Sequence, residues 1–133
     1  MPAWWRWLLV LPAAACGPAL MVAAYLLLDA ALTRLCPREL LVSGACTAGW
    51  YPAADLAATC TSVALGALAT VVPGAIAAPA RRTHVAIALM AAGTAWAAFT
   101  LFAIGPAALA PFACALVAGA AGVWLVRRRA VLD

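Results

Sequence analysis

The stretch CPRELLVSGAC, residues 36–46, gathers charged side chains, two cysteines and turn residues in an otherwise apolar chain. Cys36 and Cys46 could form a structural disulfide, act as a redox-active thiol pair, or contribute ligands to a metal site. The compartment in which the stretch lies decides among these chemistries, because disulfides persist in oxidising surroundings. The chemistry of the stretch therefore depends on the elements that carry it.

Composition marks the chain as a membrane protein. Of its 133 residues, 69% are hydrophobic and only 9% are charged, and its mean hydropathy is +1.10. Soluble domains carry about 25% charged residues. The chain has no Lys, Asn or Gln, and its richness in Ala and Arg favours a bacterial origin.

Four segments are long and apolar enough to cross a bilayer, whose hydrocarbon core of about 30 Å takes about 20 helical residues. We expect these helices over residues 7–32, 54–77, 85–104 and 107–126, with a loop over 33–53 that has room for a short β-hairpin. Gly105-Pro106 predicts a tight turn that makes the last two helices antiparallel neighbours. The predicted fold is an all-α integral membrane protein with a single four-helix transmembrane bundle over residues 1–133.

The arginines predict the orientation of this bundle. When four helices are threaded in and out, one side receives Arg6, Arg81, Arg82, Arg127, Arg128 and Arg129. The positive-inside rule then places both termini in the cytoplasm and the long loop outside, in a bacterial inner membrane. We expect all of these arginines except Arg6 to contact anionic lipid, at about 1 kcal/mol each. No basic run is interleaved with aromatic residues, so nucleic acid is not an expected partner.

An outward loop favours a Cys36–Cys46 disulfide, with Ser43-Gly44 as the turn of a small hairpin. In the chain-entropy model this disulfide is worth about 2–3 kcal/mol. A redox-active role needs a second cysteine pair to relay electrons by thiol exchange, and the other outward connection is only Gly105-Pro106. The single histidine, His84, falls on the opposite membrane face, which disfavours a metal site. No metal or cofactor is expected.

A polar cluster is predicted at the outer ends of the first two helices: Asp29, Arg34, Arg38, Glu39 and Asp55. Intramembrane carboxylates by default indicate a proton or cation path. We instead expect Asp29 to pair with Arg34, and Asp55 to lie in the first turn of its helix, where it complements the helix dipole. No catalytic residue is assigned.

Small residues at four-residue spacing predict close packing between helices. The pairs are Gly66 and Thr70, Gly93 and Ala97, Ala115 and Gly119, and Ala118 and Gly122. Cys60 and Cys114 fall at a similar depth in the second and fourth helices, where we expect them to pack as small apolar residues.

The remaining polar groups at mid-membrane depth are hydroxyls and thiols, which suit hydrogen bonds between helices better than acid, base or cation chemistry. We therefore expect a non-enzymatic accessory, assembly or stabilising subunit of a membrane complex, or a homo-oligomer. Its expected partners are membrane lipids and either another membrane protein or a second copy. The alternatives are a small transporter or channel for a neutral or hydrophobic solute, and a lipid-modifying enzyme that uses the outer polar cluster.

Overall fold

The computed structural model describes residues 5–78 and 80–132, with side chains for residues 7–78 and 80–129. Four long helices account for most of this part of the chain: α1 (Trp5–Leu35), α2 (Tyr51–Ala77), α3 (Arg82–Ile104) and α4 (Leu109–Leu132). All four are long and apolar enough to cross a membrane, which confirms that prediction. The expectations for the side chain of Arg6 lie outside the described residues.

Helices α1 and α2 extend beyond their predicted ends for local reasons, whereas α4 begins two residues later than predicted, at Leu109. Helix α1 continues three residues past the predicted end at residue 32, and Pro37 follows soon after it. The residue before a proline is biased away from helical geometry. Helix α2 begins three residues earlier than predicted, because Pro52 lies in its first turn, where a missing backbone N–H costs no helical hydrogen bond. Pro73 lies inside α2.

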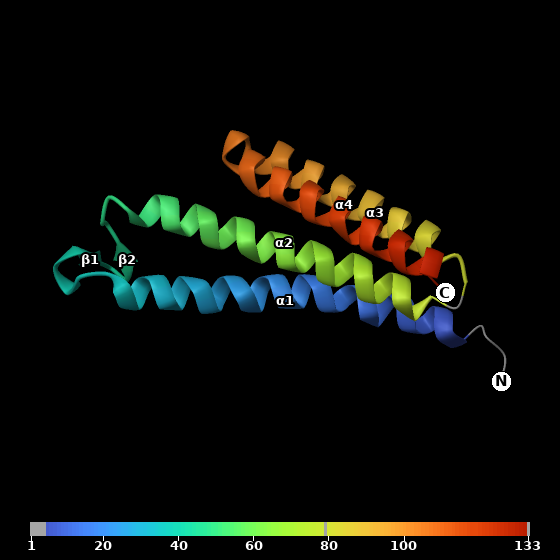
Figure 1. Ribbon diagram of the computed structural model, residues 1–133. Coiled ribbons are helices and arrows are strands. Elements are labelled where there is room, and N and C mark those ends of the chain that lie inside the picture. Colours follow the sequence, from blue (N-terminus) through green and yellow to red (C-terminus); the bar gives the residue numbers. More distant parts are fainter. Residues whose placement is uncertain (1–4, 79, 133) are drawn as a thin grey trace.

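The helices form two antiparallel hairpins, α1–α2 and α3–α4 (Figure 1). The hairpins lie together at the end that carries both chain termini, called here the terminal end, and diverge toward the opposite, loop end (Figure 1). A buried apolar core of Val71, Ala75, Ala86 and Val126 joins α2, α3 and α4 near the terminal end. The core therefore holds the second hairpin at one end only.

Helices α1 and α2 approach closely through small residues. A Cβ atom added at Gly17 would lie 2.6 Å from the carbonyl oxygen of Gly66 and 2.7 Å from the backbone nitrogen of Thr70. Gly66 in turn faces Met21, and a Cβ there would lie 2.7 Å from the Met21 Cβ. In lipid, such backbone proximity supplies much of the energy of helix association. The predicted Gly66 and Thr70 face thus packs on α1.

The other predicted small-residue pairs differ in their surroundings. Gly122 packs against Val71 of α2, whereas a Cβ at Gly93 would meet no atom within 4 Å. A four-residue spacing of small residues therefore does not by itself show whether that face of the helix packs against another helix.

The connection between α1 and α2 contains a short 3-10 turn, η1 (Arg38–Leu40), and a hairpin of β1 (Leu41–Val42) and β2 (Ala45–Cys46). The strands pair antiparallel, with Leu41 opposite Cys46 and Val42 opposite Ala45. Ser43 and Gly44 both have positive φ, as a two-residue hairpin turn requires. Between α3 and α4, Gly105 has φ 86° and leads into a second 3-10 turn, η2 (Pro106–Ala108).

Candidate functional site

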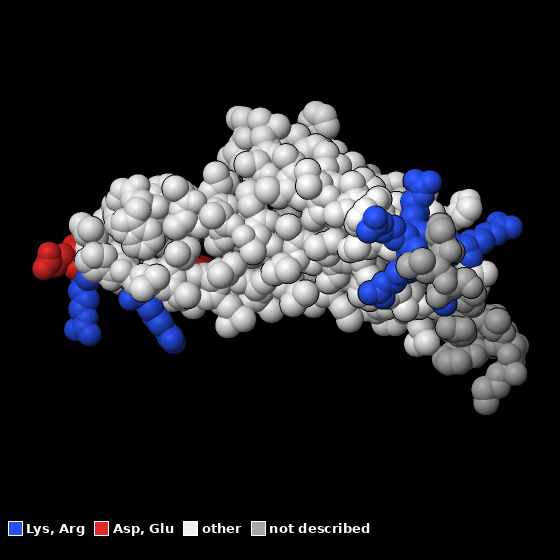
Figure 2. Space-filling view, viewed as in Figure 1, with Lys and Arg blue, Asp and Glu red and all other residues white. Residues whose placement is uncertain are grey.

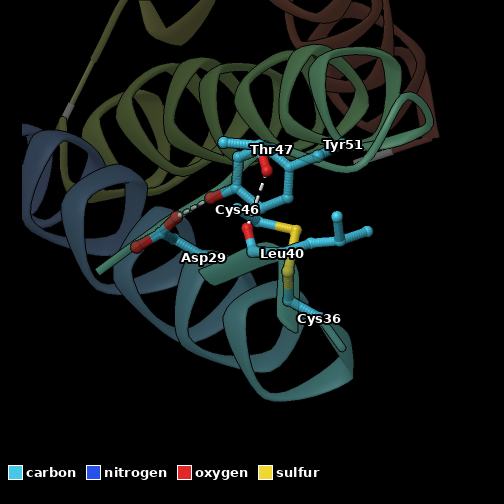
Figure 3. Close-up of a disulfide and its surroundings, with 6 residues drawn as sticks. All are labelled: Asp29, Cys36, Leu40, Cys46, Thr47 and Tyr51. Carbon is cyan, nitrogen blue, oxygen red and sulfur yellow. Dashed lines mark hydrogen bonds between the residues drawn. A yellow bond between two sulfur atoms is a disulfide. The ribbon is translucent and has the colours of Figure 1, made fainter. Parts of the chain in front are cut away.

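The loop end is closed by a disulfide between Cys36 and Cys46, with an S–S distance of 2.04 Å and a Cα–Cα distance of 6.0 Å. Thr47 completes the hairpin, because its backbone nitrogen and its Oγ1 both donate to the Leu40 carbonyl oxygen at 2.9 Å (Figure 3). The predicted cysteine pair therefore lies at disulfide distance and pins the loop across the ends of α1 and α2.

The disulfide packs on the first turn of α2. Cys36 and Cys46 are 7% and 8% exposed, and they form a buried cluster with Ala48 against which Tyr51 packs. Figure 3 shows the Tyr51 ring beside the disulfide, with its hydroxyl directed at Asp29 of α1. The loop and the helices are thus joined through one tyrosine.

Two crossed hydrogen bonds join α1 to α2 just inside the loop end. The Tyr51 hydroxyl of α2 donates to Asp29 Oδ1 of α1 at 2.9 Å, and the Tyr25 hydroxyl of α1 donates to Asp55 Oδ1 of α2 at 3.2 Å. All four groups are partly buried. Electrostatic interactions also link Tyr25 to Asp29 and to Tyr51, so the four side chains form one group, called here the Tyr–Asp cluster.

The Tyr–Asp cluster differs from the expected environment of the carboxylates. Asp29 forms no ion pair with Arg34, both of which the structure describes, and bonds to Tyr51 instead. Asp55 is the fifth residue of α2 rather than part of its first turn, because the helix begins earlier than predicted. Its carboxylate consequently reaches across to α1.

Of the five residues in the predicted outer polar cluster, Asp29 and Asp55 are brought together by the Tyr–Asp cluster. Arg34, Arg38 and Glu39 are exposed. They lie at the end of α1 and in η1, outside the hydrogen bonds that hold the two aspartates.

The sequence reasoning missed both tyrosines. A repeated signal marks them: YLLLD at residues 25–29 and YPAAD at residues 51–55 both have the form Tyr-x-x-x-Asp. Residues four apart share a helix face. In an antiparallel pair, two such faces place each tyrosine opposite the other helix's aspartate when the two segments lie at the same depth, so the repeat is a signal that could have found the cluster.

The arginines of the terminal end gather on one part of the surface (Figure 2). Arg81, Arg82, Arg127, Arg128 and Arg129 are all exposed. The guanidinium of Arg128 lies 4.3 Å from the centroid of the Trp124 ring, a cation–π contact. His84 is also exposed at this end, near the start of α3.

A cavity of about 510 Å³ lies between the two hairpins. Its walls come mainly from α2, α3 and α4, and they include no charged residue. Neither Asp29 nor Asp55 lines it. The Tyr–Asp cluster and the cavity are therefore separate features.

The thiols of Cys60 and Cys114 interact between α2 and α4. Cys16 is exposed on α1, where its thiol bonds to the Pro12 carbonyl oxygen at 3.3 Å. Among the described residues, no group of three or more His, Cys, Asp or Glu side chains is placed to hold a metal ion.

No protein-family model, curated protein or solved structure matches this chain.

Replacing Tyr51 by Phe is expected to lower the free energy of unfolding by about 1 kcal/mol, since hydrogen bonds between membrane helices are worth about 0.6 kcal/mol on average and about 1.7 at most. The measurement is unfolding in mixed micelles. In a double-mutant cycle with Asp29→Ala, the two effects should be less than additive. As a control, Thr61→Val removes only a bond within α2. Full additivity of Tyr51→Phe and Asp29→Ala would contradict the assigned bond.

Proposed function

We propose that this chain is a non-enzymatic subunit of a membrane complex, with an accessory, assembly or stabilising role, bound to a different membrane protein or to further copies of itself. The Tyr–Asp cluster is the observation that carries the proposal. Its two carboxylates are engaged by tyrosines of the neighbouring helix, and neither lines the cavity. Carboxylates on ion or proton pathways face cavities or form relays. Because both carboxylates accept hydrogen bonds from tyrosines of the neighbouring helix, they support a role in holding α1 to α2.

Helix α3 offers the surface for a partner. Of its residues, all of which the structure describes, only Ala86 is buried. Trp96, Phe99 and Phe102 are 70%, 64% and 89% exposed, and the rings of Trp96 and Phe99 lie 6.0 Å apart. Aromatic side chains are enriched among residues that dominate binding at interfaces. We assign the partner contact to these three aromatic residues.

We further propose that the terminal end faces the cytoplasm of a bacterium and that the disulfide loop faces outward. The gathering of arginines at the terminal end supports this orientation through the positive-inside rule. A membrane-impermeant maleimide should label a cysteine at Gly49 in intact cells. It should label a cysteine at His84 only after the membrane is opened, and the reverse pattern would overturn the orientation.

The test of the subunit proposal is the mass of the intact complex extracted from the native membrane in mild detergent. We expect a stoichiometric complex larger than one chain. Phe102→Ala should reduce the recovered complex at least fivefold, because it removes the most exposed aromatic of α3. Leu11→Ala is the matched control, since Leu11 is 75% exposed on α1, away from this surface. Recovery of the chain alone, also after cross-linking in the membrane, would contradict the proposal.

A small transporter for a neutral or hydrophobic solute is the second candidate, and the uncharged cavity favours it. The core of Val71, Ala75, Ala86 and Val126 closes the cavity toward the terminal end, and Val71 also lines the cavity. Transport would require this core to open. Solute flux into vesicles that contain only the purified chain would support the transporter over the subunit.

A further inference from the structure

The cavity between the hairpins has no role in the proposed subunit function. It follows α3 from Leu89 to Ile104. At 1.5 Å per residue this is about 22 Å of helix. One leaflet of a bilayer core of about 30 Å is about 15 Å deep. The cavity therefore extends from the loop end of α3 to beyond the middle of the membrane.

The floor of the cavity is the apolar core. Val71 belongs to both the core and the cavity lining, and Leu89 and Met90 line the cavity while packing against the core. From this floor the lining continues to Ile104, Ala107 and Ala108 at the loop end, where the hairpins diverge (Figure 1). An occupant that enters from the surrounding membrane can reach down to the core and no further.

The lining selects an uncharged, apolar occupant. Its hydroxyl groups come from four threonines, and three of them donate to carbonyl oxygens within their own helices: Thr59, Thr70 and Thr100. Thr94 is the remaining hydroxyl. Burying a charge against such walls would cost several kcal/mol, whereas a hydrocarbon chain brings no charge and no polar group of its own into the cavity.

The size of the cavity suits one extended chain. Its volume of about 510 Å³ falls within the range of small-molecule sites, about 300–1,000 Å³. Because its lining follows about 22 Å of helix, the cavity is elongated along α3. A long, narrow hydrocarbon chain matches this length and the apolar lining.

We propose that this cavity is a lipid-binding site that holds one hydrocarbon chain of a lipid from the leaflet at the loop end. The lipid's head group remains at the membrane surface near Gly105 and η2, and the chain lies between α2 and the α3–α4 hairpin with its tip at the core. The chain fills the space that the diverging hairpins leave open. Trp96 belongs to both the cavity lining and the partner surface, but Phe99 and Phe102 do not line the cavity, so separate substitutions can test the two sites.

Gly93 allows a direct test, because it lines the cavity and a Cβ added there meets no atom within 4 Å. Gly93→Phe should fill the cavity with a side chain. Ala92→Phe is the matched control, since Ala92 is an exposed neighbour on α3 that does not line the cavity. Both variants and the wild type are extracted from the native membrane, and native mass spectrometry counts the lipids retained on each chain.

We expect one lipid per chain on the wild type and on Ala92→Phe, and at least a fivefold smaller lipid-bound fraction on Gly93→Phe. A lipid-free wild type, a wild type that holds detergent only, or equal retention by both variants would overturn the proposal. A second measurement uses the wild type alone, in phosphatidylcholine vesicles that include phosphatidylcholine with a diazirine in one acyl chain. Photolabelling should reach lining residue Ala115, and its absence there would also overturn the site.

Discussion

Replacing Gly17 by alanine is expected to lower the free energy of unfolding by about 1–3 kcal/mol, the usual cost of overpacking a tight interface. The added methyl group would meet the backbone of Gly66 and Thr70 at 2.6 and 2.7 Å, and it would also meet the Thr70 side chain. Backbone atoms cannot move aside as the end of a flexible side chain can. Helices α1 and α2 must then separate along their length. The change is measured by unfolding in mixed micelles.

Gly93→Ala is the matched control for this prediction. Gly93 is also a helical glycine, but a Cβ there meets no atom within 4 Å. Alanine is favoured over glycine in a helix interior by about 0.5–1 kcal/mol. The two substitutions should therefore have opposite signs. Equal effects would show that α1 and α2 do not approach through Gly17.

Removing the disulfide with Cys36→Ser and Cys46→Ser is expected to cost about 2–3 kcal/mol of unfolding free energy, because the unfolded chain regains the entropy of an open loop. The effect should also reach Tyr51, which packs against the cysteine cluster and bonds to Asp29. Tyr51→Phe should consequently cost less in the disulfide-free chain than in the wild type. Unfolding in mixed micelles, with and without reductant, measures both effects.

Cys16→Ser is the control for the disulfide prediction. Cys16 is a free, exposed cysteine on α1, so its replacement removes no cross-link. Its effect should stay within about 0.5 kcal/mol, as for most surface changes. A wild type whose stability does not respond to reductant would argue that the cysteine pair is not a stabilising disulfide.

The Tyr–Asp cluster shows how local sequence and antiparallel pairing act together. Each Tyr-x-x-x-Asp segment places its two polar groups on one face of its helix. Only the register of α1 against α2, set by Gly17 packing on Gly66 and by the disulfide loop, brings Tyr25 to Asp55 and Tyr51 to Asp29. The ion pair predicted between Asp29 and Arg34 was based on their short separation along the chain. It did not take into account Tyr51 of the neighbouring helix, which bonds to Asp29 instead.

The sequence by itself determined the four apolar helices, the turns at Ser43-Gly44 and Gly105-Pro106, and the pairing of Cys36 with Cys46. These features follow from local causes: apolar length, positive φ at turn residues, and two cysteines joined by a short loop. The tertiary structure alone decided which small residues pack, because Gly17 meets backbone while Gly93 meets open space. It also decided that the hairpins diverge around a cavity, since a helix's direction depends on what it packs against at each depth.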